Sequence, residues 1–181
     1  MKVGPADVLQ LGHPALRIPS ERADVDDPGF REDGRRLLET LDAFRRRFGF
    51  GRAVAAPQIG VARRVIAVDL GQGPFLVVNP EITWWSDETF TMWDDCMCFP
   101  GLLVRLSRHR AVSLTYTDEQ GRPRQWPQLD QAASELLQHE IDHLDGILAI
   151  DRAESLRDVI SRETFERFRL EFDRQVDYAI R

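Results

Sequence analysis

Two histidines four residues apart carry the clearest chemical signal in the 181-residue sequence. His139, Glu140 and His143 form the pattern H-E-x-x-H. Residues at this spacing share one face of a helix, so both imidazoles can reach one metal ion, while the glutamate is offset toward a water molecule. An ion with three protein ligands lowers the pKa of its water toward about 7. We therefore expect metal-dependent hydrolysis with Glu140 as acid and base; a surface helix with two solvated histidines is the alternative.

A third metal ligand must come from elsewhere in the chain. No histidine follows His143 in the sequence. The downstream acids Asp145, Asp151 and Glu154 could serve, but Cys96 is the more distinctive candidate because a thiolate binds such ions tightly. The alternative role of Cys96 is that of a small buried apolar side chain.

The helix that must position the two histidines is well marked in the sequence. Asp130 is a good N-cap, and Gly146 is a typical residue just beyond a helix C-terminus. Between them, apolar residues recur at spacings of three and four: Leu136, Leu137, Ile141 and Leu144. This pattern predicts a helix that begins after Asp130 and runs to Leu144.

Two further helices are expected. Residues 33–48 carry apolar side chains at helical spacing and stop at Gly49. The C-terminal stretch places four apolar residues on one stripe: Phe165, Phe168, Phe172 and Val176. We expect one amphipathic helix in each stretch.

Short runs of β-forming residues occupy the middle of the sequence. They are residues 64–70, 75–79, 102–106 and 111–117. A turn at residues 118–122, which contains Gly121, predicts a hairpin and therefore antiparallel strands. Strands followed by helices, without regular alternation, predict an α+β fold. The length and the lack of internal repeats predict a single domain over residues 1–181.

The charge and composition argue against several classes of partner. The net charge of −6 leaves no surplus of lysine and arginine for binding DNA. No stretch approaches the roughly 20 apolar residues that cross a bilayer, and residues 1–10 lack a secretion signal. We therefore expect a cytoplasmic protein without a DNA or membrane partner.

Three separated segments resemble the motifs of the peptide deformylase family. Residues 51–58 resemble its glycine-rich first motif, residues 94–98 its second, normally Glu-Gly-Cys-Leu-Ser, and residues 138–143 match its third, Gln-His-Glu-x-Asp-His. The resemblance implies antiparallel sheets around a central helix that bears the histidines, with a C-terminal helix. It also implies a hydrolase of linear amides that processes protein N-termini during protein biosynthesis.

The resemblance assigns a role to each motif residue. Three residues would hold one divalent ion: Cys96, His139 and His143. Iron(II) is the expected metal, with zinc(II) or nickel(II) as substitutes, because one thiolate and two imidazoles accept several ions. Glu140 would transfer the proton, and Gln58 with the backbone N–H of Met97 would stabilise the oxyanion on the attacked carbonyl.

Departures from the family pattern concentrate on the substrate side. The resemblance puts four residues against the substrate: Arg52, Ala53, Val54 and Glu135. Arg52 and Glu135 stand where typical deformylases have apolar residues around the methionine side chain. If the two pair, the pocket becomes narrow or polar; if they swing to the rim, it stays open. In addition, Ala53 and Asp95 replace family glycines, and Cys98 replaces a serine.

Three functions are consistent with these residues. The leading one is removal of the formyl group from the N-terminal formyl-methionine of peptides. The second is hydrolysis of a different N-acyl substrate, either a small metabolite or a non-methionyl peptide. The third is a catalytically silent metal-binding relative, against which the intact Gln58, Glu140 and ligand set speak. We expect a monomer, and the acidic residues of the last helix weaken the case for a transient ribosome contact.

Overall fold

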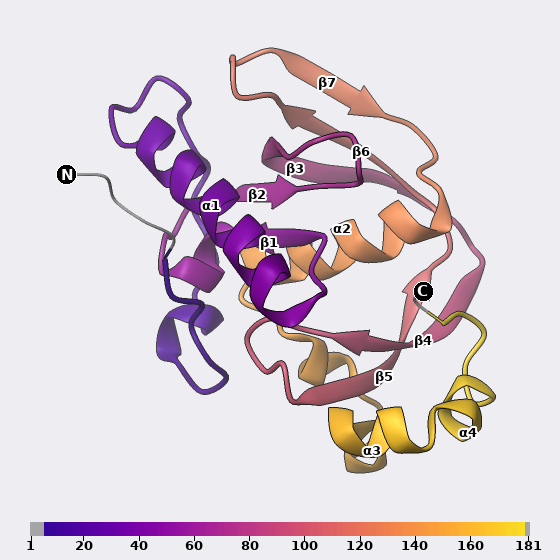
Figure 1. The fold of residues 1–181 in the computed structure, drawn as a ribbon. Coiled ribbons are helices and arrows are strands. Elements are labelled where there is room, and N and C mark those ends of the chain that lie inside the picture. The colour runs from indigo at the N-terminus through magenta and orange to yellow at the C-terminus, as the bar shows by residue number, and fades with distance from the viewer. Residues whose placement is uncertain (1–5, 180–181) are drawn as a thin grey trace.

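Helix α2 (Gln131–Leu144) lies between two antiparallel sheets in the computed structural model, which describes residues 6–179 (Figure 1). The helix begins after Asp130, whose side chain accepts a hydrogen bond from the Ala133 N–H at 2.8 Å. The α+β class and the expected helix over this stretch are both confirmed.

The larger sheet has the strand order β1-β2-β3-β6-β7, and each neighbouring pair is antiparallel. Its strands are β1 (Ala53–Ala55), β2 (Val65–Val68), β3 (Phe75–Trp85), β6 (Val112–Thr117) and β7 (Pro123–Trp126). The expected hairpin joins β6 to β7, and the Asp118 N–H donates to the Arg122 carbonyl at 2.9 Å across its turn.

The smaller sheet brings a loop with two cysteines to the other side of α2. Its strands are β4 (Thr89–Asp95), β5 (Leu102–His109) and β8 (Val159–Ser161), in the order β4-β5-β8. The sequence did not predict β4 or β8. Cys96 follows directly after the last residue of β4, so the register of this strand sets the position of the cysteine loop.

Helices pack on both faces of the larger sheet. Helix α1 (Phe30–Phe48) begins three residues earlier than expected and ends at Gly49, which has a left-handed φ of 76°. Val65 and Ala67 of β2 belong to the apolar cluster under α1, whereas Ile66 and Val68 belong to the cluster under α2. Because side chains alternate between the two faces of a strand, α1 packs on one face of this sheet and α2 packs on the other.

The expected C-terminal helix is present, but it is divided into two parts. The chain forms two short helices, α3 (Arg162–Arg167) and α4 (Arg169–Asp173), with a break at Phe168. The break lets Phe165 and Phe172 stack on each other and both reach the ring of Trp93, while Phe168 is 44% exposed. Packing against one tryptophan therefore outweighs helical continuity.

Short 3-10 turns complete the described chain: η1 (Pro14–Arg17), η2 (Ala56–Ile59), η3 (Ala149–Arg152) and η4 (Leu156–Asp158). Within residues 6–179, no helix is both long enough and apolar enough to cross a membrane.

Candidate metal-dependent active site

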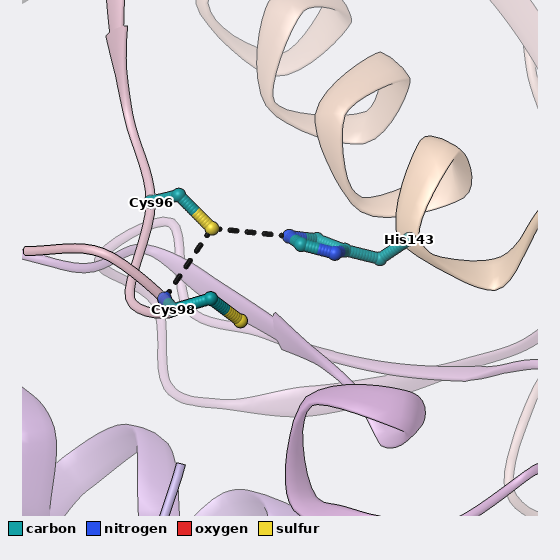
Figure 2. Close-up of side chains that lie close together, drawn as sticks. All are labelled: Cys96, Cys98 and His143. Atoms are coloured by element: carbon teal, nitrogen blue, oxygen red, sulfur yellow. Dashed lines mark hydrogen bonds between the residues drawn. The ribbon is translucent and has the colours of Figure 1, made fainter. Parts of the chain in front are cut away.

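Cys96 and His143 face each other in the buried space between the cysteine loop and α2 (Figure 2). The Cys96 Sγ lies 3.2 Å from the His143 Nε2, and the Cys98 N–H donates to the same sulfur at 3.4 Å. The ligand atoms of Cys96, Cys98 and His143 all lie within 4.8 Å of one another. Burial raises the pKa of the Cys96 thiol well above its ordinary value and lowers that of His143 well below. Both groups are therefore held neutral unless a cation accompanies them.

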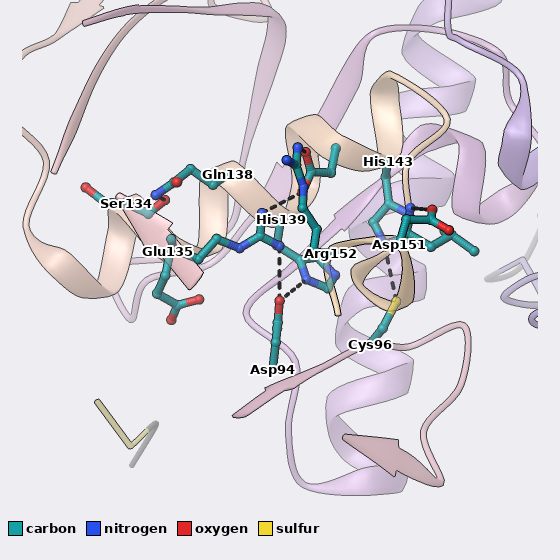
Figure 3. Close-up of polar contacts among 12 residues, drawn as sticks. Asp94, Cys96, Ser134, Glu135, Gln138, His139, His143, Asp151 and Arg152 are labelled. Atoms are coloured by element: carbon teal, nitrogen blue, oxygen red, sulfur yellow. Dashed lines mark hydrogen bonds and ion pairs between the residues drawn. The ribbon is translucent and has the colours of Figure 1, made fainter. Parts of the chain in front are cut away.

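His139 is held by a carboxylate on β4. The Asp94 Oδ2 lies 2.9 Å from the His139 Nδ1, and both residues are buried (Figure 3). Although burial disfavours the imidazolium, the charge and hydrogen bond of Asp94 outweigh it and raise the pKa of His139 to about 9. For Asp94, burial is likewise outweighed, here by His139 and Arg108, so its pKa falls to about 2. The bond to Asp94 turns the other ring nitrogen of His139, Nε2, away from β4.

A buried network fixes Asp94 in turn. Arg108 of β5 donates to the Asp94 Oδ2 at 3.1 Å and to the Asp142 Oδ2 at 2.5 Å. Asp142 also accepts from Arg152, with its Oδ1 2.5 Å from the Arg152 Nη2. Asp142 is therefore a buried side chain that links α2, the helix that carries the two histidines, to Arg108 and Arg152.

These residues fit a transition-metal ion. Thiol sulfur and imidazole nitrogen are the donors that iron, zinc and nickel accept. A ligating histidine usually donates its second ring N–H to a carboxylate, which is the relation of His139 to Asp94. The rings of His139 and His143 are 4.9 Å apart between centroids. The structure brings Cys96 and His143 together and places the His139 ring beside that of His143. The ligand roles of all three residues stay predictions.

Glu140 lies next to the first histidine with an unsatisfied oxygen. Its side chain is buried, and its Oε2 has no hydrogen-bond partner among the described residues. Burial raises the pKa of Glu140 to about 7, against the opposing charge of His139. A carboxyl with this pKa can accept and return a proton near neutral pH.

Gln58 points its amide N–H groups at the cysteines. The Ala55 N–H donates to the Gln58 Oε1 at 2.7 Å, which directs the Nε2 toward the Cys98 sulfur at 3.5 Å and the Cys96 sulfur at 3.9 Å. Met97, whose backbone was expected to provide a second donor, lies between the two cysteines and lines the same cavity. Gln58 and Met97 therefore line the same cavity, and the donor role of the Met97 N–H stays a prediction.

A cavity of about 410 Å³ opens over this cluster. Its wall includes Gln58, Cys96, His139 and Glu140 together with the expected substrate residues Arg52, Ala53 and Glu135. Ala53 lies in extended strand β1 without a left-handed φ, so its methyl group costs no backbone strain. The Val54 side chain lies instead in the core under α1, away from this wall. A substrate contact of Val54 stays a prediction.

Comparison with known proteins assigns the family. A family model described as polypeptide deformylase matches residues 5–159. The chain belongs to the polypeptide deformylase family. A deformylase of Synechocystis sp. is 31% identical over 169 residues, which cover 89% of this chain and 87% of the relative. A solved peptide deformylase from Synechococcus elongatus, in complex with actinonin, superposes with a TM-score of 0.77 at 31% identity, and the match covers 87% of this chain and 84% of that one. A solved peptide deformylase from Thermotoga maritima superposes with a TM-score of 0.77 at 30% identity, and the match covers 84% of this chain and 100% of that one.

The structure shows where the residues that differ from the deformylase family motifs lie. Arg52 and Glu135 pair in the cavity wall, as the polar-pocket hypothesis requires, and do not swing to the rim. Asp95 pairs with Arg162 at 2.8 Å, so its carboxylate turns away from the cysteine cluster. Sequence reasoning gave no role to Asp94 and did not place Cys98 at the cluster, although the Asp-x-Cys-x-Cys spacing put all three side chains on one short segment.

Proposed function

We propose that this protein hydrolyses the N-formyl amide at the N-terminus of formyl-methionyl peptides and releases formate. Family membership supports the reaction, and one observation supports the site: the buried Glu140, the directed amide of Gln58 and Cys96, whose sulfur contacts His143, border a single cavity. The catalytically silent alternative lacks a comparable observation, because each group that the chemistry needs is present and buried together.

Cys96, His139 and His143 would hold one divalent ion, for which we propose iron(II), with zinc(II) or nickel(II) as substitutes. When bound, such an ion supplies Lewis acidity toward the formyl carbonyl and lowers the pKa of water. Asp94 orients His139 for this purpose, because it holds the Nδ1 of the ring and leaves the Nε2 available, and Arg108 in turn holds Asp94.

Glu140 moves the proton in this account. Its pKa of about 7 lets it accept a proton from the attacking water and deliver it to the leaving amine. The Gln58 Nε2 and the Met97 N–H donate to the oxygen that becomes negative as the carbonyl is attacked, an arrangement whose loss typically costs about 3 to 4 kcal/mol per donor. The peptide N-terminus then leaves as a free amine.

The test is formate release from formyl-Met-Ala-Ser by anaerobically purified protein, compared with Glu140→Gln. We expect the wild-type protein to release formate, and the variant to lose about 10²- to 10⁴-fold in kcat while it retains its metal. Metal bound at equal occupancy in both proteins, with no formate from either, would contradict the proposed function.

A further inference from the structure

The cavity extends from the proposed reaction centre along α2 to a charged wall. Glu135 precedes His139 by four residues, so the two side chains share one face of the helix. Arg52 stands just before β1 and reaches the same wall, opposite the helix. A side chain next to a formylated nitrogen would therefore meet Arg52 and Glu135.

The Arg52 guanidinium and the Glu135 carboxylate pair with each other, but this pairing does not use all of their hydrogen-bonding capacity. The Arg52 Nη2 donates to the Glu135 Oε1, and the Arg52 Nη1 donates to the Ala132 carbonyl at 3.1 Å. The Glu135 side chain is 2% exposed and that of Arg52 is 31% exposed. Within residues 6–179, the Glu135 carboxylate accepts no other side-chain hydrogen bond, although an ionised carboxylate can accept about four. The wall thus offers both an acceptor and donors to a ligand.

Among residues 6–179, each of the other arginines that line the cavity is already paired with a carboxylate. Arg45 pairs with Asp69, Arg162 with Asp95, and Arg169 with Asp173. A carboxylate would compete with Glu135 for Arg52, and an ammonium would meet the Arg52 guanidinium. A neutral group that both donates and accepts, such as a carboxamide, satisfies Glu135 and Arg52 together. A thioether satisfies neither and removes water from both.

We propose that the Arg52–Glu135 wall makes this enzyme prefer N-formyl peptides whose first side chain is a carboxamide, glutamine in particular, over methionine of similar length. The inference rests on the proposed deformylase activity and concerns only its choice among formyl substrates. A site that hydrogen-bonds a substrate group discriminates strongly against an analogue without that group, because the buried polar atoms of the site are left unpaired.

The test compares kcat/KM for formyl-Gln-Ala-Ser, formyl-Met-Ala-Ser and formyl-norleucyl-Ala-Ser on metal-loaded protein. We expect the glutamine substrate to exceed methionine by about tenfold or more. The charge-neutral double variant Arg52→Leu/Glu135→Leu should reverse this order. A matched control, Asp42→Ala/Arg46→Ala, removes an exposed ion pair on α1 and should leave the ratio unchanged.

The outcomes separate the two proposals. Formate release with methionine equal to or above glutamine, and a ratio that the double variant leaves unchanged, would overturn the substrate inference alone. No formate from any formyl peptide would overturn the deformylase activity itself. If the double variant does not fold, the single variant Glu135→Gln tests the inference instead. This variant keeps the shape of the side chain but replaces the carboxylate with a weaker hydrogen-bond acceptor, so the preference for the glutamine substrate should shrink. An unchanged preference would overturn the inference.

Discussion

The two ends of the cavity differ in how their polar side chains are held: we call the end at Cys96 and His139 the metal end and the end at Arg52 and Glu135 the substrate end. At the metal end, Cys96, His139 and Glu140 are buried, and Asp94 holds the His139 ring through its Nδ1. At the substrate end, Arg52 and Glu135 form a charged wall in which the hydrogen-bonding capacity is only partly used. The reaction proposed above uses residues of the metal end, whereas the charged residues that stand in place of apolar family residues, Arg52 and Glu135, lie at the substrate end.

The largest effect is expected from damage to the metal end. Gln58→Leu removes the amide that Ala55 directs at the cysteines, so a developing oxyanion loses a donor. We expect kcat for formyl-peptide hydrolysis to fall about 10²- to 10³-fold. KM and metal content should change little, and an equal fall in metal content would show that the residue is structural instead.

At the substrate end, Glu135 should make the free energy of unfolding depend on pH. Burial raises the pKa of Glu135 to about 7 from its usual 4.5, even with Arg52 beside it. A carboxyl with a raised folded-state pKa binds more protons in the folded than in the unfolded protein, so stability falls as pH rises from about 4.5 to 7. We expect the free energy of unfolding of the wild-type protein to lose roughly 3 kcal/mol relative to Glu135→Gln across that window.

Urea unfolding of both proteins at matched metal loading checks this difference. If the free energy of unfolding depends on pH in the same way in both proteins, the pKa of Glu135 is not raised in the folded protein. The two ends of the cavity would then not differ in this electrostatic property.

A smaller effect is expected from Asp94, which contacts the predicted metal ligand His139. Asp94→Asn keeps the shape of the side chain but weakens its hold on the His139 Nδ1. Loss of such a carboxylate partner typically costs about 10- to 100-fold in metal affinity. Competition with a chelator measures the affinity, and Asp95→Asn is a matched control because Asp95 pairs with Arg162 instead. Equal losses in both variants would remove the special role of Asp94.

The sequence predicted the elements whose signals are local. The N-cap Asp130 and the apolar spacing up to Leu144 define α2 without help from the rest of the chain. The phenylalanine stripe predicted the C-terminal helix but not its break at Phe168, where Phe165 and Phe172 pack on Trp93 from a strand far away in the sequence. Local periodicity cannot report a contact of that kind.

The same limit applies to the site. The H-E-x-x-H spacing predicted His139, His143 and Glu140 as site residues. The resemblance assigned Cys96 and singled out Arg52 and Glu135. Their pairing depends on the packing of β1 against α2, which joins residues 83 positions apart in sequence. The role of Asp94 likewise depends on Arg108 from the neighbouring strand β5. These contacts are tertiary, so no spacing rule contains them.

The most direct test of the account is a crystal structure of the metal-loaded protein, with the ion located by its anomalous scattering. We predict an ion about 2.0 to 2.3 Å from the Cys96 Sγ and the Nε2 atoms of His139 and His143, with the Cys98 sulfur outside bonding distance. An ion bound by Cys96, Cys98 and His143, with His139 contacting Asp94 alone, would contradict the proposed centre.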